Sequence, residues 1–150
     1  MIVYLDTSAI VKRYIVEEGS DKVSKFYEDA LNGDLTLSFS LWNIGETIGI
    51  FDKYYRRGWI TLEDYKKVLL MFRVETRRLI RLRLLKIVPV RSRLLVRSWK
   101  LITKYHVYIG DALQILSAKY VNADKLITSD RRLYDIAIAE GINSLYIGGK

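Results

Sequence analysis

The chain has 150 residues, half of them hydrophobic, which is enough apolar material for one globular core and no obvious second one. It has no cysteine and one histidine, which excludes disulfides, thiolate nucleophiles and zinc sites built from thiolates or several histidines. The longest uncharged stretch, residues 35–45, is far too short for a membrane span or a signal sequence, so we expect a cytoplasmic protein.

The net charge of +8 is concentrated in one part of the chain. Residues 73–100 contain ten Lys or Arg and one acidic residue, Glu75. Such a cluster suits a polyanion, because neutralising phosphates releases counterions and steers association. The alternative is a solvated basic face. We expect a polyanion or an acidic partner.

Short apolar runs alternate with amphipathic segments along the first half of the chain. A short apolar run between turn residues predicts a strand, and apolar residues three or four apart predict a helix. The elements expected in this half are, in chain order, a strand at 1–5, helices at 7–14 and 20–31, a strand at 35–39, and helices at 41–57 and 61–83. The last two should pack as a helical hairpin.

The second half continues this alternation and contains the only proline, Pro89, which should end a strand. The expected elements are a strand at 84–90, helices at 92–105 and 111–120, a strand at 125–128, a helix at 130–140 capped by Gly141, and a strand at 144–147. We therefore predict an α/β fold, one domain over residues 1–150, with a mostly parallel five-stranded sheet and helices on both faces. Such sheets bind ligands beyond the carboxyl ends of their strands, where the strand order reverses.

Three aspartates occupy positions where this fold gathers polar groups. Asp6 and Asp130 each follow an expected strand, and Asp111 opens an expected helix. Taken singly, each could cap a helix, because aspartate is a preferred cap and suits the helix dipole. Together, carboxylates at these positions can instead converge on a divalent metal ion. A basic chain with such an acidic pocket is a nuclease candidate.

The neighbours of these aspartates bear on the choice between the two roles. Thr7 and Ser8 could each cap the helix that follows Asp6, and we expect Ser8 to do so, which leaves Asp6 free. Gly110 precedes Asp111 and, lacking a side chain, should leave space for a ligand close to the backbone.

Glu46 is the fourth acidic candidate, and helical periodicity argues against it. Leu41, Ile44, Ile48 and Phe51 form an apolar stripe that should face the core. Glu46 lies on the opposite side of that helix, where pattern alone predicts a solvent-exposed residue. Small residues beside it would also permit a glutamate that leans over a site.

The ordered acidic residues resemble those of the PIN-domain ribonucleases, and among them the small VapC-type toxins of toxin–antitoxin pairs. The resemblance rests on Asp6-Thr7-Ser8, on Glu46 in the third helix, on Asp111 near a helix start, and on Thr-Ser-Asp-Arg-Arg at 128–132. It covers essentially the whole chain. It implies a sheet of five parallel strands, an acidic quartet around Mg²⁺ or Mn²⁺, and hydrolysis of RNA. An antitoxin partner and a homodimer are further implications.

Within this resemblance, each acid has an expected role. Asp6 and Asp111 are the expected principal metal ligands, and Glu46 and Asp130 complete the cluster directly or through water. Thr7 and Ser129 could orient a bound water or a phosphate oxygen. The expected activity is metal-dependent, endonucleolytic RNA cleavage.

Basic residues recur at helical spacing on two of the expected helices. We expect these faces to contact RNA phosphates or an acidic or amphipathic partner peptide. The residues are Arg73, Arg77 and Arg81 on one helix, and Arg93, Arg97 and Lys100 on the next.

Two other functions fit parts of the pattern. An aspartyl-phosphate phosphatase also begins with an acid after a short strand, but enzymes of that type want a second aspartate two residues on, where this chain has Ser8. A non-catalytic basic module that binds RNA or a partner would use the acids only as caps or for metal.

Overall fold

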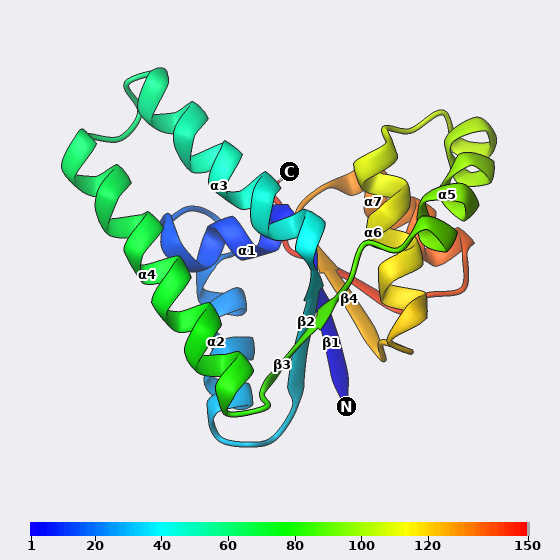
Figure 1. The fold of residues 1–150 in the computed structure, drawn as a ribbon, viewed down its shortest axis with the longest axis horizontal. Coiled ribbons are helices and arrows are strands. Elements are labelled where there is room, and N and C mark those ends of the chain that lie inside the picture. Colours follow the sequence, from blue (N-terminus) through cyan, green and yellow to red (C-terminus); the bar gives the residue numbers. More distant parts are fainter. Residues whose placement is uncertain (150) are drawn as a thin grey trace.

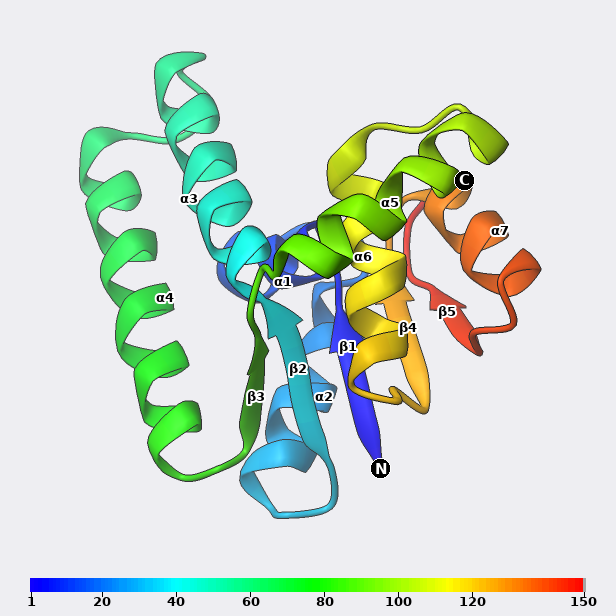
Figure 2. The ribbon, with the colours of Figure 1, turned by 45° about the vertical axis from the view of Figure 1, so that its right-hand side comes forward.

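The computed structural model describes residues 1–149, and the last residue of the predicted domain lies outside them. Its centre is a sheet of five parallel strands in the order β3-β2-β1-β4-β5, which confirms the predicted fold class. The strands are β1 (Ile2–Leu5), β2 (Thr36–Ser40), β3 (Leu85–Val88), β4 (Lys125–Thr128) and β5 (Ser144–Tyr146). The first strand, β1, is central: β2 and β3 are added on one side of it, and β4 and β5 on the other. The strand order therefore reverses between β1 and β4 (Figures 1 and 2).

Helices cover both faces of this sheet. They are α1 (Thr7–Tyr14), α2 (Ser20–Leu31), α3 (Leu41–Arg56), α4 (Leu62–Arg81), α5 (Ser92–Tyr105), α6 (Ile109–Tyr120) and α7 (Arg131–Ala139). In the described part of the chain, no helix is long and apolar enough to cross a membrane.

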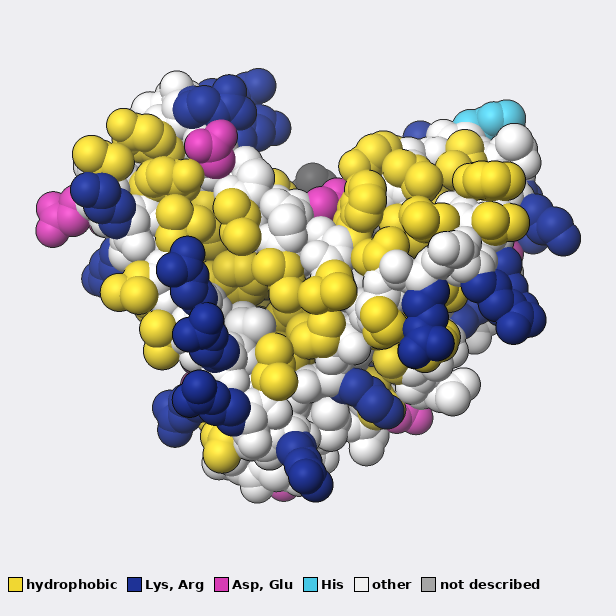
Figure 3. Space-filling model, viewed as in Figure 1, with side chains coloured by type: hydrophobic (Ala, Val, Ile, Leu, Met, Phe, Trp, Pro, Cys, Tyr) yellow, Lys and Arg dark blue, Asp and Glu magenta, His cyan; other side chains and the backbone are white. Residues whose placement is uncertain are grey.

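Alternate residues of β1 supply the two cores, because side chains alternate across a strand. Val3 and Leu5 pack with α1 to α4 on one face, whereas Tyr4 packs with α5 to α7 on the other. The α3–α4 hairpin forms one arm of the molecule and α5 to α7 form the other, with a hollow between them (Figures 1 and 3).

The expected element order is confirmed, and most boundaries agree within two residues. Helix α6 begins at Ile109, two residues before the predicted start, so Asp111 lies within its first turn. Gly141 follows α7 with φ of +79°, the left-handed conformation that glycine adopts at little cost.

The predicted buried face of α3 is right for Phe51 and for Ile44, which packs against the core, and wrong for Leu41 and Ile48. Its buried residues are Asn43, Thr47 and Phe51, whereas Leu41 is 53% exposed and Ile48 is 42% exposed. The helix is rotated because the side chain of Asn43 bonds to polar groups in the interior, which outweighs the burial of two more aliphatic side chains. This rotation also brings Glu46 toward the carboxyl edge of the sheet.

Candidate functional site

Asp6 lies at the carboxyl end of β1, next to the end of β4, and is only 3% exposed. Its Oδ1 accepts hydrogen bonds from the backbone N–H of Ala9 at 2.8 Å and from the hydroxyl of Ser8 at 2.7 Å. Its Oδ2 accepts one from the hydroxyl of Thr128 at 2.5 Å. Asp6 therefore caps α1 itself, and the prediction that Ser8 is the cap is wrong.

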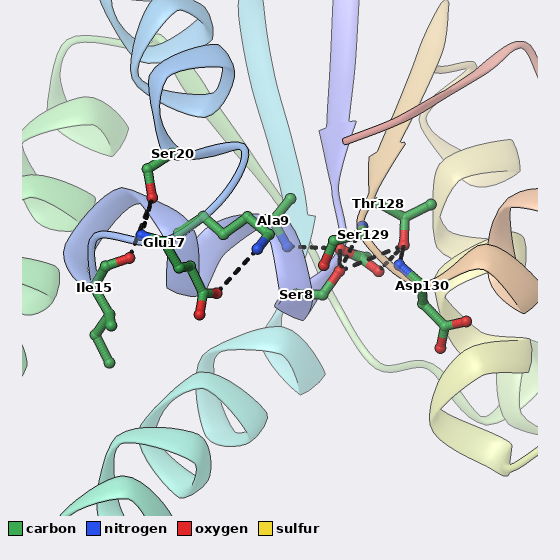
Figure 4. A network of polar contacts seen from close by, with 10 residues as sticks. Ser8, Ala9, Ile15, Glu17, Ser20, Thr128, Ser129 and Asp130 are labelled. Carbon is green, nitrogen blue, oxygen red and sulfur yellow. Dashed lines mark hydrogen bonds and ion pairs between the residues drawn. The ribbon is translucent and has the colours of Figure 1, made fainter. Parts of the chain in front are cut away.

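Residues at the end of β4 continue this network. The hydroxyl of Thr128 accepts the backbone N–H of Asp130 at 2.9 Å, and the hydroxyl of Ser8 accepts that of Ser129 at 2.9 Å (Figure 4). Asp130 is exposed, and its Oδ1 accepts the N–H groups of Arg132 and Leu133, which caps α7. At the switch point of the sheet, the hydroxyl of Thr128 thus bonds to the side chain of Asp6 and to the backbone of Asp130.

Asp111 differs from the other two aspartates because it caps nothing. The capping position of α6 is Tyr108, so the half-buried carboxylate of Asp111 is left in the first turn. Within residues 1–149 that carboxylate accepts no hydrogen bond. The charge of Arg132 lowers the pKa of Asp111 but does not offset burial, so a cation bound at this position would stabilise the carboxylate.

Glu46 is half-buried rather than exposed, which corrects the expectation from periodicity. Its Oε1 accepts the hydroxyl of Thr7 at 2.9 Å, and the side-chain amide of Gln114 donates to the same oxygen at 3.4 Å. Thr7 thereby links the start of α1 to α3. Ser129, the other second-tier residue, contributes its backbone N–H to the site.

A buried amide pair behind Glu46 was not predicted from the sequence. The Asn43 amide nitrogen donates to Thr7 at 3.0 Å and to Gln114 at 2.8 Å, and its oxygen accepts the backbone N–H of Ser40 at 2.7 Å. The Tyr4 hydroxyl lies 2.9 Å from the side-chain oxygens of both Asn43 and Gln114. The one sign of this pair in the sequence is that Asn43 and Gln114 are polar residues within helices that pack against the core. This network fixes the side chains that hold Glu46.

Gly110 does not leave an open space beside Asp111, contrary to the expectation. A Cβ at this position would collide with the ring of Tyr108 and would lie 3.0 Å from the indole nitrogen of Trp42. The glycine therefore lets these two rings pack against the start of α6. We call the carboxyl edge of the sheet with Asp6, Glu46, Asp111 and Asp130 the acidic edge. Tyr108 is 56% exposed and feels the charges of Glu46 and Asp111, so it lies near this edge.

The carboxylates are coupled through their charges. Burial raises the pKa of Asp6 to about 6, and the charge of Asp130 adds to this. Burial also raises the pKa of Asp111 to about 6, with the charges of Asp130 and Glu46 acting in the same direction. Opposing hydrogen bonds from Thr128 and Ser8 favour ionised Asp6. The charge of Asp130 thus acts on both Asp6 and Asp111.

The donor set of this edge suits a hard divalent cation. Within residues 1–149 no three Asp, Glu or His side chains already form a group arranged to hold a metal ion. Magnesium, however, is usually held by one or two carboxylates and keeps several waters. Asp6 and Asp111 supply two carboxylates, and a divalent cation would offset the burial and the repulsion from Asp130 that raise their pKa values.

The six predicted basic residues lie on α4 and α5, elements that carry none of the four acids. The predicted set on α4 and α5 is exposed, and none of its six members forms an ion pair within the described residues. The two helices belong to different arms, so the sequence-predicted stripes form two surfaces rather than one (Figures 1 and 3).

These features define an α/β domain with a carboxylate-lined edge at its topological switch point. The family model of the PIN domain matches residues 3–139, and the chain belongs to that family. A search of curated proteins by sequence finds no match.

Solved structures with the same fold are distant in sequence. A chain of VapBC2 from Rickettsia felis, solved bound to a fragment of promoter DNA, is 18% identical with a TM-score of 0.64, over 97% of this chain and 98% of that one. VapC20 of Mycobacterium tuberculosis, a toxin that cleaves the sarcin–ricin loop, is 12% identical with a TM-score of 0.66, over 93% and 95%. FitAcB from Neisseria gonorrhoeae is 17% identical with a TM-score of 0.62, over 97% and 96%.

Proposed function

We propose that this protein is a Mg²⁺- or Mn²⁺-dependent endoribonuclease and the toxin of a toxin–antitoxin pair. The observation that carries the proposal is Asp111, a half-buried carboxylate without a hydrogen-bond partner in the described chain, next to the charges of Asp130 and Glu46. Asp111 is not the cap of α6, and although the helix dipole and the charge of Arg132 favour its ionised form, burial still raises its pKa. A cation bound there would relieve that cost.

Asp6, Asp111, Glu46 and Asp130 are the proposed catalytic and metal-holding residues. Asp6 and Asp111 would hold the metal, and Asp130 and Glu46 would complete the acidic edge. Bound there, a divalent ion would make a water molecule more acidic and offset negative charge on the phosphate. The chain's own contribution is to fix its carboxylates, because preorganised groups do not need to reorganise during the reaction.

Two sets of hydrogen bonds provide that fixed geometry. Ser8 and Thr128 donate to the two oxygens of Asp6, which keeps its carboxylate ionised and oriented. Thr7 and Gln114 both donate to Oε1 of Glu46, so within the described residues its Oε2 accepts no hydrogen bond. The second oxygen can then orient a bound water or a substrate hydroxyl.

RNA is the proposed substrate, and an antitoxin the proposed protein partner. The net charge of +8 favours a polyanion, and the exposed arginines of α4 and α5 supply contacts for phosphates or for the partner. The likeness to VapBC2, VapC20 and FitAcB supports the toxin assignment. We further propose a homodimer that acts in the cytoplasm.

A non-catalytic basic binding module is the alternative. It is favoured by the caps, because Asp6 and Asp130 each accept backbone N–H groups at a helix start. In that case the two aspartates serve folding alone, and RNA would be bound without being cut.

Cleavage assays on matched variants distinguish these two functions. Purified wild-type protein, Asp111→Asn and Asp135→Asn are incubated with a panel of structured RNAs, with Mg²⁺ or with EDTA. Asp135 is a control on α7, because its side chain is 63% exposed. We expect cleavage by the wild type and Asp135→Asn only with metal, and at least a hundredfold loss in Asp111→Asn. Equal rates in all three proteins would refute the assignment.

A further inference from the structure

We propose that a pocket beside Glu46 holds an unpaired RNA base next to the phosphate that is cut. This inference rests on the proposed ribonuclease function and deepens it. The pocket has a volume of about 610 Å³ and is lined by Leu41, Trp42, Gly45, Glu46, Pro89 and Val90. Hydrophobic side chains gather in the hollow between the two arms of the molecule (Figure 3).

The pocket adjoins the acidic edge, because Glu46 lines it. Glu46 belongs to both, because one of its oxygens is bound by Thr7 while its side chain also lines the pocket. A nucleotide whose phosphate reaches the acids therefore has this cavity within reach of its own base or the next one. The volume falls in the range of small-molecule sites, and one carboxylate provides a polar contact in an otherwise apolar lining.

Aromatic side chains give the pocket the character of a base site. The indole of Trp42 forms part of the wall, and Gly110 allows it to pack against the start of α6. Tyr108 does not line the pocket, but it is 56% exposed, its ring and the Trp42 indole both lie beside Gly110, and it feels the charges of Glu46 and Asp111. Single-stranded RNA is recognised largely by stacking unpaired bases on such rings, whereas phosphates are bound by basic groups.

The charges beyond the pocket fit the backbone of the same strand. Val90 in the pocket wall is followed at once by Arg91, which lines a second cavity of about 260 Å³ together with Arg93, Arg97 and Tyr120. Within residues 1–149 none of these three arginines is neutralised by an acidic side chain. An apolar pocket with a carboxylate in its lining and uncompensated arginines on the next residues of the chain suits a base followed by phosphates, so we assign RNA rather than a protein segment to it.

Gly45 allows the pocket to be filled without disturbing the fold. A Cβ at Gly45 meets no atom within 4 Å, and the same holds for Gly49, one turn further along α3. Gly49 does not line this pocket. Leucine at either position raises helix propensity equally. Gly45→Leu therefore occupies the pocket, and Gly49→Leu is its matched control.

The test compares RNA oligonucleotides that differ by one base. The probe is a short single-stranded RNA cut once by the wild type, together with two versions in which one nucleotide on either side of the cut lacks its base. We expect wild type and Gly49→Leu to lose roughly tenfold in kcat/KM on one abasic version, as stacking requires. Gly45→Leu should be roughly tenfold slower on the intact RNA and show no further loss on the abasic one.

Other outcomes would overturn the base site. Gly45→Leu could cut intact RNA at the wild-type rate, or could still distinguish the two substrates. The wild type could ignore the missing base while Gly45→Leu alone changes the oligomeric state in analytical ultracentrifugation, which would assign the pocket to a protein contact.

A failure of the proposed ribonuclease function can be told apart from a failure of the base site. If the wild type cuts no RNA, the nuclease assignment fails, and the pocket is then tested by fluorescence anisotropy with the same labelled oligonucleotides. A base-dependent affinity that Gly45→Leu removes and Gly49→Leu retains would sustain the pocket. Equal affinities for all the oligonucleotides would exclude it.

Discussion

The hydroxyl of Thr128 donates to Oδ2 of Asp6 at 2.5 Å across the boundary between β4 and β1. The same hydroxyl accepts the backbone N–H of Asp130 at 2.9 Å. One fully buried threonine therefore sets the positions of two of the four acids at the point where the strand order reverses.

Thr128→Val should separate the two hydrogen bonds of the hydroxyl from the packing of the side chain, because valine matches the shape of threonine and lacks the hydroxyl. Leaving the N–H of Asp130 unpaired should lower the free energy of unfolding by about 1–3 kcal/mol. RNA cleavage should fall at least tenfold, since Asp6 loses a donor. Thr128→Ser restores the hydroxyl and should recover most of the activity. Chemical denaturation and cleavage kinetics measure the two effects, and an active Thr128→Val protein would show that this bond does not position the site.

Asp111→Asn should stabilise the metal-free protein. Burial and the charges of Asp130 and Glu46 disfavour the ionised carboxylate, which raises its pKa to about 6. At pH 7 the charged form therefore costs stability, by roughly 1 kcal/mol once solvent screening is allowed for. Thermal unfolding in EDTA should show a higher Tm for Asp111→Asn than for the wild type. A lower Tm would mean that the carboxylate stabilises the fold rather than serving a site.

The amide network behind Glu46 predicts a contrast between two residues on α3. Asn43→Leu leaves the buried N–H of Ser40 without its acceptor and removes the amide that donates to Thr7 and Gln114, so it should cost about 2–4 kcal/mol. Thr47→Val should be neutral or stabilising, because the buried hydroxyl of Thr47 has no hydrogen-bond partner in the described chain. Urea denaturation of both variants checks this contrast. Equal losses would indicate that burial alone matters on this helix face.

The lowered pKa of Glu140 predicts how the free energy of unfolding changes with pH. It accepts hydrogen bonds from Tyr105, Lys119 and Lys104, and the bond from Tyr105 is the main reason that its pKa falls to about 2. A carboxyl whose pKa is lower in the folded state stabilises the fold above its unfolded pKa, near 4.5, and loses that contribution as the pH falls toward 2.

The matching variant is Glu140→Gln. It should lower the free energy of unfolding at pH 7 by about 1 kcal/mol, a value that allows for screening around the exposed lysines. At pH 2 the difference from the wild type should vanish. Urea unfolding across this range measures it, and a difference that does not change with pH would contradict the assigned cause.

Helical and strand periodicity predicted the element order, because apolar runs and turn residues act locally. It failed on α3, where the buried residues Asn43 and Thr47 are polar and the apolar Leu41 is exposed. Partners distant in the sequence decide that face. Asn43 bonds to Gln114 from another helix, and no local pattern encodes such a pair.

The candidate acids were found from the sequence because strand ends and helix starts can be predicted. Their arrangement could not be. That Asp6 caps α1 while Asp111 caps nothing depends on where each helix begins, and α6 begins two residues before its predicted start. The rings of Tyr108 and Trp42 beside Gly110 could not be predicted either, because they belong to the starts of two helices that are distant in the sequence.

A titration of the protein with Mn²⁺, followed by electron paramagnetic resonance, tests most directly whether the acidic edge holds a divalent cation. The measurement compares wild type, Asp111→Asn and the exposed control Asp135→Asn at pH 7. We predict a saturable site in the wild type and in Asp135→Asn, with affinity reduced at least tenfold in Asp111→Asn. Equal Mn²⁺ binding by all three proteins, or no saturable binding by the wild type, would contradict the account.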